Sequence, residues 1–441
     1  MFALCPRGSL SFGKFRPATF RRCAMFSAAL LAGLALAAHA QAQQYRTIPP
    51  QLSERAAKQL TLIVAQALRN PQNFQQDKTE IDAYFKKYYF PKMTSTLPAD
   101  LGLLAKRRED LFKRYIRSAQ VKAAQEYLTD MTLKITRSIA QGNYHPAVRY
   151  NAVLILGELD QQYTVPPVPL PAGTNALLEL LEKEDFKGVK VPASVRLGAL
   201  VGLARHARFG IDAQYADRVT KAALGLIAEE QSPADLAPEV HHWMKCQAAR
   251  ILANQYAQKP NPQIQSALTA MIADSKMNLE DRCCMAALLK KFKYEAAEGI
   301  DGTATLVALG GLTKDVVSDE ASLARDYQKA VLQSAPATGR GGFGRIPSGA
   351  GSAGPKYQRR RLLARLKAVT DGAQSLQAIL PDAAKEQLKS LITPLASVMQ
   401  TAADKNALDL DVTRQVLELA SEIDNVVNGW QQPANAAKKP A

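Results

Sequence analysis

The chain has 441 residues, 47% hydrophobic and 22% charged, so it is long enough for several domains or for one extended array of repeats. Lysine and arginine outnumber aspartate and glutamate by 56 to 40, and the formal net charge of +16 favours acidic partners such as anionic lipid headgroups, acidic polysaccharides or acidic protein surfaces. Five cysteines exclude the cysteine-dense disulfide framework of small secreted domains.

The first 42 residues have the pattern of a secretory signal peptide. Five basic residues and no acidic residue flank the start of an apolar run at 24–38, and two small-x-small cleavage sites follow it within 38–42. This run is shorter than the roughly 20 residues that a membrane-spanning helix needs. We therefore predict an exported protein of bacterial type, periplasmic or secreted; an uncleaved N-terminal anchor is the alternative.

Residues 43–119 are predicted to form an N-terminal helical region. Apolar residues recur at three-to-four spacing in a first helix over 53–68. Asp77-x-x-Glu80 has the form of a capping box that opens a second helix, which Pro91 is expected to end. A third helix is predicted to begin near Pro98.

Between residues 120 and 333 the predicted helices fall into pairs. The pairs are 121–140 with 145–159, 174–184 with 192–207, 213–230 with 238–256, 262–275 with 279–292, and a degenerate fifth pair within 303–333. The sequence shows no convincing alternating strand pattern and no Asn-Gly hairpin signal. The pattern therefore predicts an all-α fold.

A short motif recurs in the second helix of successive pairs. Its four copies, two clear and two weaker, centre on Val148-Arg149, Val195-Arg196, Met244-Lys245 and Asp281-Arg282. The basic residues of these copies are separated by 47, 49 and 37 residues. A helical unit that recurs at roughly 40 to 47 residues is the signature of HEAT and armadillo repeats.

Through this motif the chain resembles HEAT-repeat proteins. The matching residues are Pro146, Val148, Arg149, Ala152, Leu156 and Leu159 in the first copy, and Pro192, Val195, Arg196, Ala199 and Leu203 in the second. The resemblance implies an α-solenoid of about five helix pairs over 120–333, in which the apolar positions form the core between repeats and the arginine tethers neighbouring turns. Such solenoid surfaces usually bind peptides, helices or polymers.

The remainder of the chain changes character twice. Residues 334–358 are rich in Gly, Ser, Pro and Arg and are predicted to be a flexible linker. Residues 359–430 are predicted to form a C-terminal helical region, either a separate small bundle or a docking cap, and 431–441 a disordered tail.

The linker region is strongly basic, with nine lysines or arginines and no acidic residue between Asp326 and Asp371. The residues that we single out as contacts to an anionic membrane surface or an acidic polymer are Arg340, Arg345, Lys356, Arg359, Arg360 and Arg361. A solvated linker is the alternative. The match of 339–344 to Gly-x-Gly-x-x-Gly lacks the flanking strand and helix of a dinucleotide site, and export disfavours a nucleic-acid partner.

Cys246 and Cys283 occupy equivalent positions in successive copies of the motif, which allows a disulfide between neighbouring helices. Buried unpaired thiols are the alternative. Glu239, His241, His242 and Cys246 share one helix, but a polar helix face is favoured over a metal site because no second ligand-rich segment accompanies them apart from Cys283 and Cys284.

The sequence contains no nucleophile motif and no repeated His-Glu dyad, so we predict no catalysis and no cofactor. The predicted function is that of an exported HEAT-repeat scaffold that mediates protein–protein interaction in the cell envelope. The first alternative is a binder of anionic membrane or acidic polymer through the basic linker. The second is a repeat-type lyase, which would require an acid/base cluster on one face of the solenoid.

Overall fold

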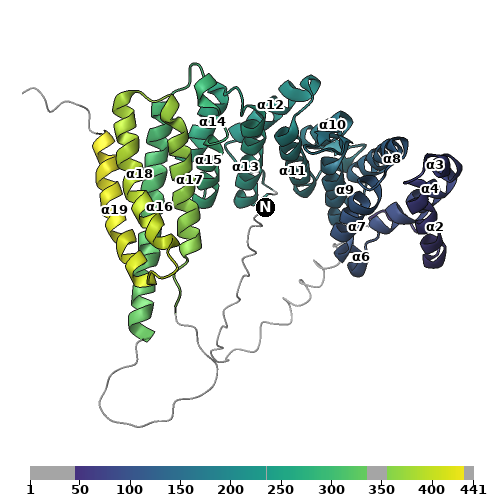
Figure 1. Cartoon of the computed structure of the whole chain (residues 1–441), viewed down its shortest axis with the longest axis horizontal. Coiled ribbons are helices and arrows are strands. Elements are labelled where there is room, and N and C mark those ends of the chain that lie inside the picture. The colour runs from purple at the N-terminus through teal and green to yellow at the C-terminus, as the bar shows by residue number, and fades with distance from the viewer. Residues whose placement is uncertain (1–44, 235, 335–354, 432–441) are drawn as a thin grey trace, which may run out of the picture. The chain divides into compact units, whose positions relative to one another are not determined.

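The computed structural model describes residues 45–234, 236–334 and 355–431. The chain divides into a short unit, Met1–Tyr45, and a compact unit, Arg46–Ala441, which holds all the elements described below. The described residues of this unit are all-α apart from two very short strand pairs (Figure 1).

The N-terminal region consists of short helices. They are α2 (Glu54–Ala67), α3 (Pro71–Gln76), α4 (Lys78–Tyr84), η1 (Phe85–Tyr89), α5 (Phe90–Met93), α6 (Pro98–Gly102), α7 (Leu104–Asp110) and η2 (Leu111–Ile116). The predicted helix over 53–68 is confirmed, and Ser53 caps it.

Two predictions about the second helix are wrong. Asp77 precedes α4, but its side chain makes no capping hydrogen bond. Pro91 does not end the helix either, because the chain continues from α4 through the π-helical turn η1 into α5, where Pro91 lies in the first turn. A proline inside a continuous helix removes one backbone donor, and the helix ends two residues later, at Met93.

The middle of the chain holds longer helices. They are α8 (Lys122–Gln141), α9 (Pro146–Glu158), α10 (Pro171–Glu182), α11 (Ala193–Phe209), α12 (Ala213–Ala228), α13 (Pro238–Gln255), α14 (Pro262–Ala273), α15 (Leu279–Leu289), the short η3 (Tyr294–Ala296) and α16 (Gly302–Ser334). The four predicted pairs from 121 to 292 are confirmed to within a few residues at each end. The fifth is wrong, because 303–333 lies in the single helix α16.

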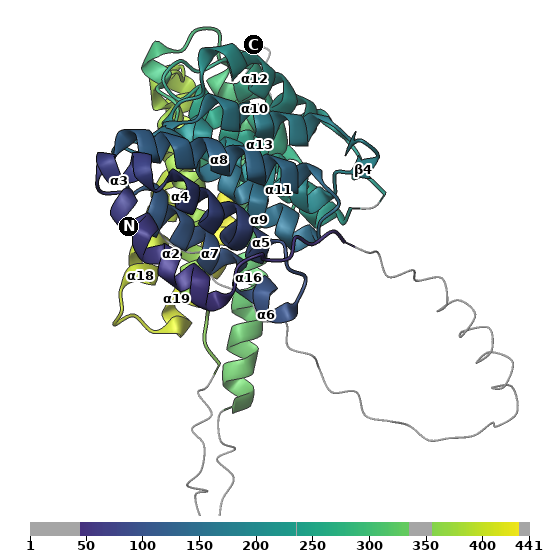
Figure 2. The same cartoon turned by 90° about the vertical axis from the view of Figure 1, so that its right-hand side faces the viewer.

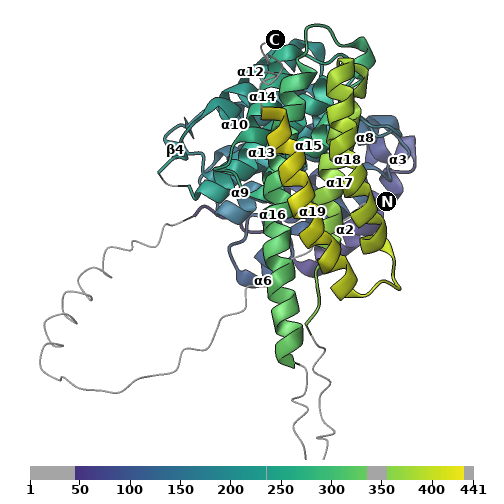
Figure 3. The same ribbon diagram turned by 90° about the vertical axis from the view of Figure 1, so that its left-hand side faces the viewer.

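The C-terminal elements are α17 (Arg359–Ser375), η4 (Leu376–Ala378), α18 (Asp382–Ala403) and α19 (Asp409–Gln431). Helix α17 packs on both α15 and α16, and α19 packs along α16 (Figure 3). The helices after the predicted linker are therefore not separate from those before it, since α17 packs on α15 and α16 and α19 packs on α16.

The helices from α8 to α17 pack in two rows. In one row each of α8, α10, α12, α14 and α16 contacts the next, and in the other each of α9, α11, α13, α15 and α17 does so. Each helix of the first row also packs on the following helix of the second, so that the pairs lie side by side along the chain (Figure 1).

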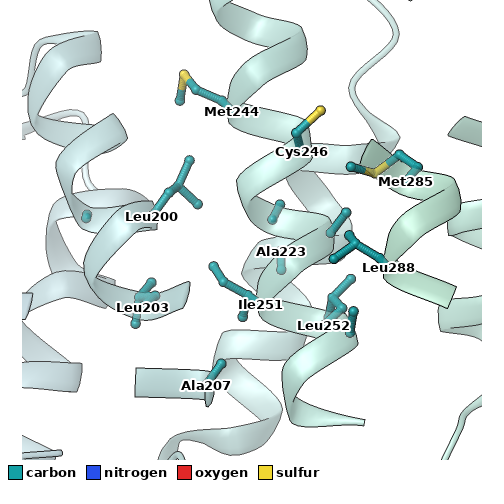
Figure 4. Packing of buried hydrophobic residues seen from close by; sticks show 14 of the residues in the cluster. Leu200, Leu203, Ala207, Ala223, Met244, Cys246, Ile251, Leu252, Met285 and Leu288 are labelled. Carbon is teal, nitrogen blue, oxygen red and sulfur yellow. The ribbon is translucent and has the colours of Figure 1, made fainter. Parts of the chain in front are cut away.

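The recurring motif supplies the core between these helices. Its apolar positions are buried in the first three copies, at Val148, Ala152 and Leu156, at Val195, Ala199 and Leu203, and at Met244, Ala248 and Leu252. Figure 4 shows this core where α11, α13 and α15 meet, with Leu203, Ile251 and Leu288 on successive helices. Burial of these side chains drives the packing of one pair on the next.

Two short antiparallel strand pairs interrupt the helices. Strand β1 (Asp160–Gln162) pairs with β2 (Val168–Pro169), and β3 (Asp185–Phe186) pairs with β4 (Val189–Lys190). Figure 2 shows the hairpin of β3 and β4 at the edge of the helical rows. Its turn residues Lys187 and Gly188 both have positive φ, a conformation usually supplied by Asn-Gly, so the sequence lacked the usual signal.

Candidate functional site

The basic residue of the recurring motif binds the end of the preceding helix. Arg149 Nε donates to the carbonyl oxygen of Ala140 at 2.8 Å, and Arg282 Nε donates to that of Ile272, also at 2.8 Å. Lys245 Nζ donates to the carbonyl oxygen of Glu229. The last carbonyl groups of a helix have no intrahelical donor, so these side chains satisfy acceptors that would otherwise be left open.

Arg196 departs from this pattern. No hydrogen bond or ion pair of its side chain is found within the described ranges, and its Nε is a buried donor without an acceptor. The cause is local: the chain leaves α10 after Glu182 and turns through the β3–β4 hairpin before α11 begins. The residues that correspond to Ala140 and Ile272 in position fall in this hairpin, and no helix-end carbonyl meets Arg196.

A cavity of about 470 Å³ lies where this tether is absent. Its walls come from the end of α10, the hairpin, the starts of α11 and α13, and the end of α12, and Arg196 is one of the lining residues. The apolar part of the lining includes Val191, Leu226 and Met244, all of which are buried. The volume falls in the range of small-molecule sites.

The polar side of the cavity contains a histidine–carboxylate pair. His241, 2% exposed, has its Nε2 at 2.9 Å from Oε2 of Glu229. The sequence pattern groups His241 with residues of its own helix and does not identify this partner, because Glu229 lies just past the end of α12. The useful signal was the carboxylate at the end of the preceding helix.

A second set of polar residues, missed in the sequence, links successive pairs of helices. Arg205 donates to the carbonyl oxygen of Gly157 and to both carboxylate oxygens of Asp160, and Asn254 donates to the carbonyl oxygen of Ala204. Lys291 donates to Oδ1 of Asn254 at 2.5 Å. Arg205, Asn254 and Lys291 each stand nine residues after the basic residue of their copy of the motif, so the same repeat spacing could have identified them.

The predicted anion-binding residues fall into three groups. Arg340 and Arg345, like the glycine-rich match at 339–344, lie outside the described residues. Lys356 and Arg360 are exposed.

Arg359 and Arg361 are engaged within the chain. Arg359 pairs with Asp409, and Arg361 Nε donates to Glu320 at 2.9 Å. These two guanidinium groups hold α17 against acidic residues of α19 and α16, which leaves less of their charge for an external partner.

Arg365, which is not among the predicted anion-binding residues, is the centre of the largest ion-pair cluster in the described part of the chain. It bridges Glu280 of α15 and both Asp319 and Glu320 of α16. Burial alone would lower its pKa, but the hydrogen bonds to Asp319 and Glu280 raise the pKa above the ordinary arginine value. The cluster therefore joins three helices through a side chain that stays charged.

The structure describes Cys246, Cys283 and Cys284 as free thiols, so of the two alternatives for Cys246 and Cys283, a disulfide or buried unpaired thiols, it has the unpaired thiols. Burial raises the pKa of Cys246, with smaller effects from Asp281 and Cys284, and burial raises the pKa of Cys283 to about 12. Protonated, buried thiols act as small apolar groups.

Within the described ranges no group of three or more His, Cys, Asp or Glu side chains is arranged to hold a metal ion. Among the helices of those ranges, none combines the length and apolar character required to cross a bilayer.

A scan against models of known protein families, a search of curated proteins and a search of solved structures each found no match. The function of this chain is therefore inferred from its own residues.

Proposed function

We propose that the chain is an exported HEAT-type scaffold that binds a protein partner in the cell envelope. The observation that carries the proposal is the unbroken row of α9, α11, α13, α15 and α17, each packed on the next. A row of this kind gives a long continuous surface built from equivalent positions of successive repeats, which suits the binding of an extended partner.

The repeated tethers support a HEAT-type solenoid. Arg149, Lys245 and Arg282 contact the preceding helix end in the same way despite unequal spacing along the chain. In this proposal the solenoid has five pairs, and the fifth consists of α16 and α17, with the basic segment between them.

The exposed apolar residues of α13 are the proposed centre of partner binding. Val240 and Trp243 are 37% and 36% exposed and lie three residues apart, hence on the same side of the helix. Exposed aromatic residues on an otherwise polar surface often supply most of the binding energy of an interface. An interaction through the basic segment is the competing function, and the ion pairs of Arg359 and Arg361 weigh against it.

The test uses the chain without residues 1–42 as bait in an envelope extract, at low and at physiological salt. One variant carries Val240→Ser and Trp243→Ala. The other carries Arg340→Gln, Arg345→Gln, Lys356→Gln and Arg360→Gln, and keeps Arg359 and Arg361 because their pairs hold α17.

A discrete protein that is lost with the α13 variant and retained by the basic-segment variant, at both salt concentrations, would support the scaffold. Capture that disappears with the basic-segment variant or at physiological salt would move the function to the basic segment, because exposed charge contacts are screened by salt.

A further inference from the structure

Three basic side chains from successive helices of the second row lie close together. Arg208 lies in the last turn of α11, Arg250 on α13, and Lys291 just past the end of α15. Arg208 and Lys291 line one cavity of about 1210 Å³ at this end of the helices. Partial burial lowers the pKa of Lys291, and the charges of Arg208 and Arg250 lower it further, so the three cations are near enough to repel one another.

The groups that these cations contact are neutral. Lys291 Nζ donates to Oδ1 of Asn254, and Arg250 Nη2 donates to Sγ of Cys284 at 3.0 Å. Arg208 is exposed, and within the described ranges neither Arg208 nor Lys291 forms an ion pair. An anionic partner at this place would therefore relieve the repulsion between like charges.

The cavity as a whole has a positive excess. Its charged lining consists of Arg208, Lys259 and Lys291 against Asp217 and Glu298, and all five are exposed. Asp217 also lines a separate groove between α12 and α14. Neither carboxylate is among the groups that shift the pKa of Lys291. The two carboxylates therefore leave the part of the cavity around Lys291 positive.

The same side of α13 carries the exposed Trp243. Arg250 follows Trp243 by seven residues and Asn254 follows Arg250 by four, so the three share one stripe of the helix, and Asn254 lines the cavity. Two helical turns, about 10 Å, separate Trp243 from Arg250. A partner that contacts the whole stripe needs both apolar groups and anions. A peptide supplies both, whereas an acidic polysaccharide lacks the apolar side chains and a flat bilayer does not enter a cavity.

We propose that the protein partner contributes an acidic segment that lies along α13, with its carboxylates at Arg208, Arg250 and Lys291 and its apolar side chains at Trp243. This role rests on the proposed scaffold function and adds the chemical class of the partner. Charge complementarity of this kind selects the partner and accelerates its association.

The test measures the fluorescence anisotropy of a labelled peptide in which a run of glutamates follows two leucines, and of the same peptide with glutamines in place of the glutamates. We expect saturable binding of the glutamate peptide at physiological salt and about tenfold weaker binding of the glutamine peptide. Arg208→Gln with Lys291→Gln should weaken binding of the glutamate peptide about tenfold. Arg55→Gln with Lys58→Gln, which removes the same charge from exposed positions of α2, should leave it unchanged.

Lysine acetylation with limiting acetic anhydride locates the peptide on the unsubstituted protein. The glutamate peptide should protect Lys291 but not Lys58, as measured by mass spectrometry. The proposal is overturned if the glutamate peptide shows no saturable binding, if the glutamine peptide binds equally well, if a folded Arg208→Gln, Lys291→Gln protein retains the affinity, or if Lys291 is not protected. Phosphatidylglycerol vesicles that protect Lys291 when the peptide does not would also overturn it.

Capture from the envelope extract distinguishes failure of this role from failure of the scaffold. A partner that is lost with Val240→Ser and Trp243→Ala but retained with Arg208→Gln and Lys291→Gln would leave the scaffold in place and overturn the acidic segment. If no version captures a protein while the glutamate peptide still protects Lys291, the scaffold fails and the surface for acidic peptides stands.

Discussion

Equivalent arginines have different roles in this chain because their surroundings differ by one short hairpin. Arg149 donates to Ala140 and also to the carbonyl oxygen of Lys190, and Arg282 donates to Ile272 and to Asp315. Arg196 has no such contact within the described ranges. A motif that identifies the repeat therefore does not by itself determine what each copy contributes to stability.

This difference predicts unequal costs for the same substitution. Arg149→Met removes two charge-assisted hydrogen bonds and leaves two carbonyl groups without a donor, so we expect the free energy of unfolding to fall by about 2 to 4 kcal/mol. Arg196→Met removes no hydrogen bond found in the described structure and should change it by less than about 1 kcal/mol. Urea unfolding of both variants measures the difference, and equal losses would contradict the assignment.

The burial of His206 should make the stability of the fold depend on pH. The side chain is fully buried with its Nδ1 at 2.8 Å from Oγ1 of Thr174, and burial lowers the pKa of His206 to about 3. The folded-state pKa of His206 lies below its unfolded value of roughly 6.5. The stabilisation that depends on the neutral ring is therefore fully present above about pH 6.5. This stabilisation is lost as the pH falls from 6.5 towards 3.

We expect the contribution of His206 to fall by about 1.4 kcal/mol per pH unit once the pH is well below 6.5. Urea unfolding between pH 7 and 5 should show a shallower pH dependence in His206→Gln than in the unsubstituted protein. His242→Gln, at a partly exposed histidine, is the control. An unchanged pH dependence in His206→Gln would show that protonation of this ring is not opposed by folding.

At the scale of the elements, two helices meet through glycines. A Cβ atom on Gly157 of α9 would lie 2.5 Å from the Cα of Gly202 on α11, closer than real Cβ contacts allow. The backbones are therefore in direct contact, and neither can move aside as the end of a flexible side chain could. This close approach joins the first pair of helices to the second.

Gly157→Ala should therefore lower the free energy of unfolding by about 1 to 3 kcal/mol, as overpacking of a core does. The control is Gly311→Ala in α16, where the added Cβ would meet nothing within 4 Å. That substitution should be neutral or stabilising by up to about 1 kcal/mol, because alanine has the higher helix propensity. Thermal unfolding distinguishes the two, and a stabilising effect of Gly157→Ala would contradict the backbone contact.

The helices illustrate which parts of the fold could be predicted from the sequence. Helix pairs from 121 to 292 were predictable because apolar spacing and caps such as Asn261 act locally. The continuity of α16 was not, because its packing depends on a helix at the far end of the chain, where Trp430 of α19 lies close against Gly310. The cavity was not predictable either, since Arg196, Glu229 and His241 come together only when three connections fold.

At the scale of the compact unit, one side chain links the C-terminal helices to the rows. Arg365 on α17 contacts Glu280 of α15 and the fully buried Glu320 of α16, which also accepts from Tyr357 and Arg361. Without Arg365, the buried carboxylate of Glu320 would keep Arg361 as a cationic partner and would be only partly compensated.

Arg365→Met should therefore lower the free energy of unfolding by about 2 to 3 kcal/mol, which is the loss expected for charge-assisted hydrogen bonds to a buried carboxylate that keeps other donors. Hydrogen exchange followed by mass spectrometry should show faster exchange in α17, α18 and α19, with little change in α9 and α11. Arg360→Met, at the exposed neighbour on α17, should alter neither stability nor exchange. Faster exchange spread evenly over all helices would contradict a local role for Arg365.

The packing of α16 on α19 has a consequence for the order in which the chain can fold. Contacts from α8 to α15 join helices that are near in sequence. Each pair of helices can therefore pack as soon as the next pair has been synthesised. In contrast, Lys314 reaches Asn428 and Asp424 across more than 100 residues. The side of α16 that packs on α19 stays exposed until α19 has formed. A chain that ends before Asp409 would therefore expose this side to proteases and to other incompletely folded copies of the chain.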